Sequence, residues 1–288
     1  MLAAVKKRRR KRALISLVIL ALLIATILVA LWSGITVSRY TVSLPGLPKA
    51  FEDYRIVVIS DMHCQSFGEN QEDLIAKIHS LDPDMIAFTG DMLDKTILDP
   101  QATQVLCEAF EGIVPMYAVL GNHDLWISSG DTKALTDVYA SHGVTLLRGE
   151  AVPLTIGNDT VYLHGADDPA HWGNDTVGFL EENPPPVSPV DHAVNILLYH
   201  RANAFPALNS LGFDLIIASH MHGGQVRIPF IGGLVSPTRE LFPDYTAGYF
   251  SENNTQMVVS RGLGNSVSVP RVFNPPELVL ITLRGEQK

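Results

Sequence analysis

The segment from Ala13 to Trp32 constrains the fold more than any other, because it holds twenty residues without a charge. Only Ser16 and Thr26 within it are polar. A helix of twenty residues rises ~30 Å, which matches the hydrocarbon core of a bilayer. A buried helix of a soluble protein is disfavoured, since such helices are seldom apolar on every side over this length. We therefore expect residues 13–32 to form a transmembrane anchor, with Trp32 at the membrane interface.

A block of basic residues directly precedes this apolar segment. All seven residues from Lys6 to Arg12 are lysine or arginine, and no acidic residue occurs before Glu52. Such a block could bind nucleic acid, but its position beside an apolar segment favours a topology signal. By the positive-inside rule, residues 1–12 form a cytoplasmic flank and the rest of the chain lies on the other side of the membrane.

A cleaved signal peptide is the alternative to a permanent anchor. Signal peptides have a shorter apolar region, ~7–15 residues, followed by small residues at the cleavage site. Here the apolar segment ends in the bulky pair Leu31 and Trp32. An uncleaved anchor is therefore favoured, and cleavage is left open.

The charge of the chain is divided unevenly along its 288 residues. The net charge is −9, but seven of the 21 basic residues lie in the flank, so the rest of the chain has 14 basic against 30 acidic residues and carries −16. This acidity disfavours nucleic acid as a partner. A hydrophobic content of 47% excludes a disordered chain, and two cysteines cannot frame a disulfide scaffold of this length.

Beyond a linker over residues 33–49, which contains Pro45 and Pro48, β-branched runs alternate with amphipathic stretches. This alternation predicts an α/β fold with parallel strands and one domain over residues 50–288. The proline-rich segment 181–190 is expected to be a loop. We expect strands near residues 55–60, 84–89, 116–120, 144–147, 160–164, 195–199, 214–218, 257–260 and 278–283, and helices near 69–80, 100–112 and 132–142.

Five of the expected strands are followed at once by side chains that bind metals or move protons. The carboxyl ends of parallel strands meet at one edge of a sheet, so these side chains can converge. Carboxylate, imidazole and amide groups suit borderline divalent cations, and their number exceeds the four ligands of a structural zinc site. Two ions that share a carboxylate, ~3.5–4 Å apart, suit hydrolysis of phosphoesters. The residues are Asp61, His63, Asp91, Asn122, His123, Asp124, His200, His220 and His222.

The ordered series D-x-H, G-D, G-N-H-D, H and H-x-H-G-G resembles the calcineurin-like metallophosphoesterases, and in particular their bacterial branch with an N-terminal membrane or export segment. The resemblance covers nearly all of residues 50–288, including SHMHGGQVRIP, GLVSP and SRGLGNSVSVPRVFNPPEL. It implies a metallophosphoesterase-type sandwich of two β-sheets flanked by helices. Ser219, where the family commonly has glycine, and the Tyr199-His200-Arg201 setting depart from its pattern without removing a ligand.

The resemblance also implies a role for each residue of the series. One divalent metal ion (Mn, Fe or Zn) would be bound by Asp61, His63, Asp91 and His222, and a second by Asp91, Asn122, His200 and His220. His123 would stabilise the phosphoryl transition state or protonate the leaving oxygen. Asp124 would orient His123 and keep it protonated.

The expected protein is a membrane-anchored, binuclear-metal phosphoesterase, in particular a phosphodiesterase, in which a metal-bridging hydroxide attacks phosphorus and the catalytic domain faces outward. One alternative is a pyrophosphatase or phosphodiesterase acting on a lipid-linked or UDP-sugar-lipid substrate. Another is a non-catalytic, membrane-tethered binding protein on the same fold. The substrate would be a small-molecule or lipid phosphoester, and the oligomeric state and native metals are left open.

Several further side chains have an open role in the sequence. Arg201, Arg261 and Arg271 could contact a substrate phosphate or be ordinary structural arginines. His164 is expected to have a structural or substrate-rim role. Cys64 is expected to pack rather than bind metal, and a bridge between Cys64 and Cys107 is left open.

Overall fold

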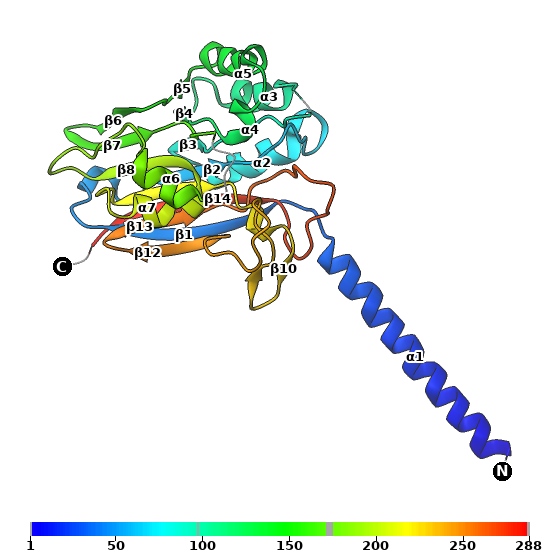
Figure 1. The fold of residues 1–288 in the computed structure, drawn as a ribbon. Helices are drawn as coiled ribbons and strands as arrows, with labels where there is room; N and C mark the ends of the chain where they lie inside the picture. The colour runs from blue at the N-terminus through cyan, green and yellow to red at the C-terminus, as the bar shows by residue number, and fades with distance from the viewer. Residues whose placement is uncertain (1, 97, 171–174, 287–288) are drawn as a thin grey trace.

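The computed structural model describes residues 2–96, 98–170 and 175–286, which form one long N-terminal helix and a body built around two six-stranded sheets (Figure 1). The strand order is β1-β14-β2-β3-β4-β5 in the first sheet and β12-β13-β9-β8-β7-β6 in the second. Helices cover the outer faces. The predicted α/β class and the two-sheet sandwich flanked by helices are confirmed.

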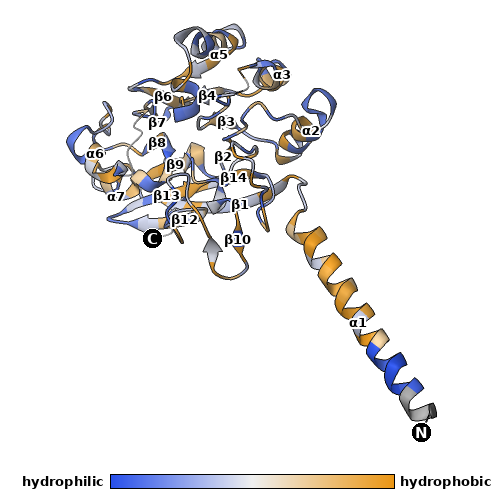
Figure 2. Cartoon of the chain, turned by 45° about the vertical axis from the view of Figure 1, so that its right-hand side comes forward, coloured by the Kyte–Doolittle hydropathy of each residue, from blue (hydrophilic) through white to orange (hydrophobic). Residues whose placement is uncertain are grey.

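The N-terminal helix α1 (Leu2–Ala30) projects away from the body, as Figures 1 and 2 show. Its side chains from Lys6 to Val29 are exposed, with the basic residues at the outer end and apolar residues along the rest. The stretch Lys6–Ala30 has a mean hydropathy of 3.0 in its most apolar window and is long enough to cross a membrane. The basic flank and the apolar segment thus form one continuous helix. It ends at Ala30, two residues before Trp32, the expected end of the anchor.

The first sheet has a parallel centre and a mixed edge. Strands β2 to β5 run parallel, while β14 is antiparallel to β2 and parallel to β1. The strands are β1 (Thr36–Leu44), β2 (Arg55–Ile59), β3 (Met85–Phe88), β4 (Met116–Ala118), β5 (Val144–Leu146) and β14 (Glu277–Gly285). The helices that connect them are α2 (Glu72–Leu81), α3 (Gln101–Phe110), the short α4 (Asn122–Leu125) and α5 (Ser129–Ser141).

The second sheet has parallel central strands, β7, β8, β9 and β13, with an antiparallel strand at each edge. Its strands are β6 (Glu150–Ile156), β7 (Asp159–Gly165), β8 (Asn195–Arg201), β9 (Leu215–Ser219), β12 (Gly248–Glu252) and β13 (Thr255–Val259), with α6 (Thr176–Glu182) and α7 (Phe205–Leu208) beside it. A small hairpin of β10 (Arg227–Ile228) and β11 (Gly232–Gly233) follows β9. Short 3-10 turns occur at η1 (Lys49–Phe51), η2 (Glu69–Gln71), η3 (Ala202–Ala204) and η4 (His222–Gly224).

The core consists of three apolar layers. Alternate residues of β2 face opposite ways: Ile56 and Val58 lie between the sheets, whereas Val57 and Ile59 lie under the helices. The layer between the sheets gains Ile196 and Ile217 from the second sheet. Because central strands are buried on both faces, they read as continuous apolar runs, which explains why the sequence reveals them.

The prediction that residues 33–49 form a linker is wrong for Thr36–Leu44, which is strand β1. All nine of its residues pair in register with β14, from Thr36 with Glu277 to Leu44 with Gly285. As an edge strand, β1 is buried only in part, and its partner lies about 240 residues away, so neither an apolar run nor a nearby turn marks it. The edge strands β6 and β12, with largely exposed side chains, were likewise not predicted.

The other expected strands and helices are present, with ends shifted by a few residues. The proline-rich segment 181–190 has no regular structure beyond Glu182, where α6 ends.

Candidate metal centre

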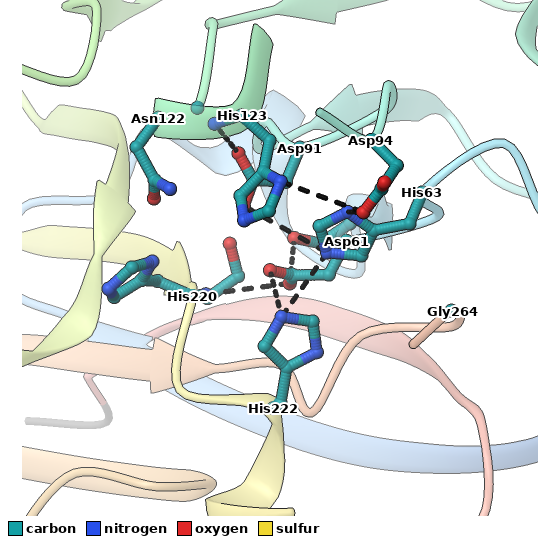
Figure 3. A network of polar contacts seen from close by, with 12 residues as sticks. Asp61, His63, Asp91, Asp94, Asn122, His123, His220, His222 and Gly264 are labelled. Carbon is teal, nitrogen blue, oxygen red and sulfur yellow. Dashed lines mark hydrogen bonds and ion pairs between the residues drawn. The ribbon is translucent and has the colours of Figure 1, made fainter. Parts of the chain in front are cut away.

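Four of the predicted ligands form one buried group at the carboxyl ends of the strands. Asp61 and His63 follow β2, Asp91 follows β3, and His222 follows β9. Each offers one ligand atom, and these atoms all lie within 4.8 Å of one another. Figure 3 shows the four side chains pointing toward a common centre.

A second group shares Asp91 with the first and adds His200, from the end of β8, and His220. The Nε2 atom of His200 lies 3.2 Å from His220 Nδ1 and 3.1 Å from the amide oxygen of Asn122. All seven predicted ligands therefore lie in one continuous cluster, although they are spread over more than 160 positions of the chain.

Asp91 stands between the two groups. Its Oδ2 atom lies 3.2 Å from His200 Nε2 and 3.9 Å from His63 Nε2. Its Oδ1 atom accepts a hydrogen bond from the backbone N–H of His123 at 2.7 Å. One carboxylate oxygen is thus anchored, and the other faces both sets of imidazoles.

The backbone at the strand ends is left-handed, which turns these side chains inward. Asp61, His63, Asp91, His220 and His222 all have φ between 46° and 74°. Such conformations cost of order 1–3 kcal/mol each in non-glycine residues and persist where the surrounding structure enforces them, typically at functional sites. Gly121 permits a close approach of the neighbouring loop, because a Cβ atom there would lie 2.2 Å from Asp91 Oδ1.

Buried oxygen atoms in the cluster have no hydrogen-bond donor, which fits a bound cation. Asp61 Oδ1 and Asp91 Oδ2 are both in this state, and both face histidine nitrogens. A buried carboxylate oxygen without a partner costs free energy that a divalent cation would offset. The imidazole, carboxylate and amide groups are those that borderline divalent cations accept.

The same burial shifts the ionisation of the metal-free site. Burial raises the pKa of Asp61 to about 6 and lowers that of His63 to about 4. Burial also acts to lower the pKa of His200, but the neighbouring carboxylates, Asp91 foremost, raise it to about 10. The Asp91 carboxylate thus favours the protonated form of His200 when no metal is bound, and a metal that binds His200 must displace that proton.

Asp94 is a buried carboxylate of the site that the sequence reasoning missed. Its Oδ2 atom lies 3.7 Å from Nδ1 of His123 and 3.6 Å from Nδ1 of His63, as Figure 3 shows. It belongs with both histidines to a third group that could hold a metal. The signal was present, since a second aspartate follows Asp91 after two residues, within the same strand-end loop.

The predicted partnership of Asp124 with the His123 ring is wrong. The Asp124 carboxylate accepts hydrogen bonds from the backbone N–H groups of Asp91, Gly121 and Leu93, at 2.8 to 2.9 Å. The physical reason is that both residues lie in α4, where neighbouring side chains point about 100° apart. Asp124 therefore holds the two ligand loops together, and Asp94 takes the place beside His123.

A cavity of about 800 Å³ opens over the cluster. Asp91, Asn122, His123, His220 and His222 line its inner wall, while Val235, Val267 and Val269 line the outer part. The ligand cluster is therefore accessible to a substrate of considerable size.

Among the three arginines considered as phosphate contacts, Arg201 lines this cavity. Its guanidinium also binds Asp168, with Nε 2.6 Å from Oδ2. Arg261 pairs with Glu277, and Arg271 donates to backbone carbonyls behind His222, so both have structural contacts instead.

His164 and Cys64, whose roles the sequence left open, both make contacts that stabilise the fold. His164 is buried and its Nε2 atom lies 2.9 Å from the Asn195 side chain. Cys64 packs against the core layer under the helices, as expected, and no disulfide joins it to Cys107 among the residues that the structure describes.

Comparison with known proteins identifies the family of this chain. The family model of the calcineurin-like phosphoesterases matches residues 54–224, more than half of the chain, so the chain belongs to that family. It is a metal-dependent phosphoester hydrolase, with clusters of histidine and aspartate able to bind the metal.

Three curated relatives match most of the chain. The uncharacterized metallophosphoesterase YkuE of Bacillus subtilis is 27% identical over 87% of this chain and 86% of its own length. The phosphodiesterase YaeI of Escherichia coli is 25% identical over 80% of this chain and 82% of its own. The UDP-2,3-diacylglucosamine pyrophosphatase LpxG of Chlamydia trachomatis is 25% identical over 90% of this chain and 94% of its own.

Proposed function

We propose that this protein is a membrane-anchored phosphodiesterase whose site holds two divalent cations, Mn, Fe or Zn. The observation that carries the proposal is the position of Asp91, whose free oxygen faces His63 on one side and His200 on the other. Asp61, His63, Asp91 and His222 would hold one cation, and Asp91, Asn122, His200 and His220 the other.

The residues around the cluster supply the remaining steps of a hydrolysis. Cations bound there would lower the pKa of a water molecule and offset the charge that develops on the phosphoryl oxygens. His123 lines the cavity beside the ligands and donates a proton to the leaving oxygen as its bond to phosphorus breaks. Asp94, beside His123 Nδ1, orients the ring and stabilises its protonated form.

Hydrolysis of a lipid-linked pyrophosphate is the second candidate. The likeness to LpxG over 90% of the chain favours it, together with an N-terminal helix long enough to cross a membrane. The same displacement at phosphorus serves both substrates, because the site stabilises the phosphoryl group rather than its substituents. A non-catalytic binding role is disfavoured, since all seven ligand side chains and His123 are retained at one place.

The anchor gives the domain an orientation. We expect the basic flank to stay in the cytoplasm and the catalytic domain to lie outside, because seven basic residues stand at the outer end of α1. Protease added to intact cells should then degrade the domain and leave α1 protected. A domain that is digested only after lysis would contradict this orientation.

The activity is tested with the purified full chain, loaded with Mn²⁺ and offered nitrophenyl monoesters, nitrophenyl diesters and a nucleotide-linked pyrophosphate. Diester cleavage is expected to be fastest, and metal analysis of the same preparation should give two ions per chain. On an alkyl diester, whose leaving oxygen needs a proton, His123→Ala should lower the rate about 10²-fold or more, as loss of a general acid does. His79→Ala, in the exposed face of α2, is the matched control. An inactive chain with both ions bound would contradict the proposal.

A further inference from the structure

Three loops at the outer rim of the cavity expose large apolar side chains to solvent. Phe230, at the tip of the β10–β11 hairpin, is fully exposed, and its neighbour Ile231 is 67% exposed. Exposed pairs also occur at Leu241 with Phe242 and at Val267 with Val269. We call these six residues the apolar rim. Large apolar side chains exposed in several neighbouring loops are typical of a contact with a partner or a membrane.

The hairpin that carries Phe230 and Ile231 is connected by hydrogen bonds to the place where α1 leaves the domain. The backbone N–H of Phe273 donates to the carbonyl of Ala30, the last residue of α1, at 2.7 Å. The preceding residue, Val272, accepts at 2.9 Å from the N–H of Arg227, which begins the hairpin. Among the side chains described from Lys6 to Ala30, Ala30 alone is buried. The helix end is thus held against the segment that carries the hairpin.

The hairpin points toward the side on which α1 leaves the body. In Figures 1 and 2 both β10 and α1 extend from the same end of the domain, away from α3 and α5. A membrane crossed by α1 would therefore face the hairpin tip, because only Leu31 to Ile35 separate the helix from β1. Those five residues span at most ~18 Å when fully extended.

The apolar rim is continuous with the catalytic cavity. Val267 and Val269 belong to both, and with Val235 they face the inner wall that carries His123 and His222. The hairpin also borders a second cavity of about 430 Å³, lined by Phe230, Ile231 and Phe273. A molecule in the main cavity can therefore place its phosphate at the ligands and its apolar part against the rim.

The charge of these loops differs from that of the rest of the domain. Residues 225–243 and 261–276 together contain four arginines and one glutamate, Glu240, whereas the chain beyond the basic flank carries −16. Arg239 is exposed and lies close in sequence to Leu241 and Phe242, and such a residue suits the phosphate-rich interface of a bilayer, whereas Arg261 and Arg271 have the structural contacts described above. Two copies of this acidic domain would repel each other, which disfavours a second chain as the occupant.

We infer that the apolar rim enters the interface of the membrane that α1 spans, and that the site acts on phosphoesters whose alcohol part is a lipid of that membrane. The second half of this inference rests on the proposed function. Water supplies the oxygen of the new bond to phosphorus, the bond to the leaving oxygen breaks, and that oxygen takes up a proton.

Membrane contact is tested without activity, on the full chain in vesicles of phosphatidylcholine and phosphatidylglycerol. The variant Phe230→Trp adds one tryptophan fluorophore to those of the parent chain. The matched control is Ile113→Trp, because Ile113 is 65% exposed and follows α3. Brominated lipids should quench the added emission at position 230 several-fold more than that at 113. Equal quenching would overturn the inference, as would an emission shift at 230 that depends on protein concentration in detergent, which indicates a second copy.

Substrate class is tested with two esters that release the same nitrophenolate. Phosphatidyl-p-nitrophenol is presented in the vesicles, and bis(p-nitrophenyl) phosphate is supplied in solution. The double variant F230S/I231S should lose about tenfold of the rate on the lipid ester but stay within about twofold on the soluble one, and Ile113→Ser should change neither. Equal effects on both esters would overturn the lipid assignment. If the parent protein cleaves neither ester, the proposed function fails, while the quenching result still decides membrane contact.

Discussion

Replacing Asp94 by asparagine isolates the contribution of a charge beside His123, the proposed proton donor. In the parent protein the backbone N–H of Thr96 donates to Asp94 Oδ1 at 2.8 Å. Asparagine has the same shape and an amide oxygen that can accept this hydrogen bond. What the variant loses is the negative charge 3.7 Å from His123 Nδ1. Both side chains are buried, so solvent screens this pair only weakly.

The magnitude follows from the distance. Two unit charges about 4 Å apart interact by roughly 4 kcal/mol at an effective dielectric constant of about 20, the value that suits protein sites. Since about 1.4 kcal/mol corresponds to a factor of ten, the full interaction is worth on the order of 10³, and neighbouring cations would reduce it. We expect Asp94→Asn to lower kcat by ~10²–10³ for esters whose leaving group needs a proton, within the range of general acid catalysis.

The assay uses a series of diesters that differ only in the leaving alcohol. Nitrophenolate leaves without a proton, so Asp94→Asn should lower its release by less than about tenfold, while alkyl esters show the full loss. A plot of log kcat against leaving-group pKa should therefore be steeper for the variant. Metal content is measured on each preparation, because Asp94 also lies 3.6 Å from Nδ1 of His63.

The matched control is Asp137→Asn, which removes a carboxylate from an exposed ion pair on α5 and should change neither slope nor rate. If Asp94→Asn leaves the metal content intact and lowers the rate equally for every leaving group, the assignment of Asp94 as partner of a proton donor is refuted. An unchanged rate for the alkyl esters would refute it as well.

Three further predictions concern the metals and the fold. Asp91→Asn removes the carboxylate that both groups share and should leave at most one ion per chain by metal analysis, with kcat lowered by more than about 10³. A chain that begins at Phe51 lacks β1 and its two fully buried side chains, Val42 and Leu44. Their burial contributes ~3–6 kcal/mol, a large part of the ~5–15 kcal/mol that is typical for the free energy of unfolding of a protein. The thermal unfolding midpoint of this chain should therefore fall far below that of a chain beginning at Ser33. Because the pKa of Asp61 is raised to about 6 in the metal-free protein, its carboxyl is protonated below that pH, and metal affinity measured by titration should fall steeply from pH 7 to pH 5. A pH-independent affinity, a Phe51 chain as stable as the longer one, or an Asp91→Asn variant with two ions would each contradict the structure.

The central strands and the ligand cluster could be predicted because one physical cause marks both. A strand buried on both faces reads as an apolar run, and the first polar residues after it lie at the carboxyl edge of the sheet. Asp61 after β2 and Asp91 after β3 follow this rule, and the structure brings them into one group. The edge strands β1, β6 and β12 could not be predicted in this way, because they are only partly buried and do not read as apolar runs. In addition, β1 pairs with β14 at the far end of the chain.

The partner of His123 could not be found from adjacency alone. Asp124 follows His123 in the sequence, but the helical turn of α4 directs it to the backbone of the Asp91 loop. Asp94 reaches His123 because the loop after β3 curls back over the carboxyl edge, with the backbone N–H of His63 donating to the carbonyl of Asp91 at 3.1 Å. Deciding between the two aspartates requires the path of the loop, which only the fold provides.

The reassignment of residues 36–44 from linker to strand changes the relation between anchor and site. A flexible linker of seventeen residues would let the domain turn freely relative to α1, so nothing could be inferred about which way the cavity faces. Instead, five residues join α1 to β1, and β1 is paired along its whole length with β14. The helix end is further fixed by the Phe273–Ala30 hydrogen bond. In the proposed arrangement, a domain held this closely would present one face to the bilayer, the face that carries the apolar rim and the mouth of the cavity.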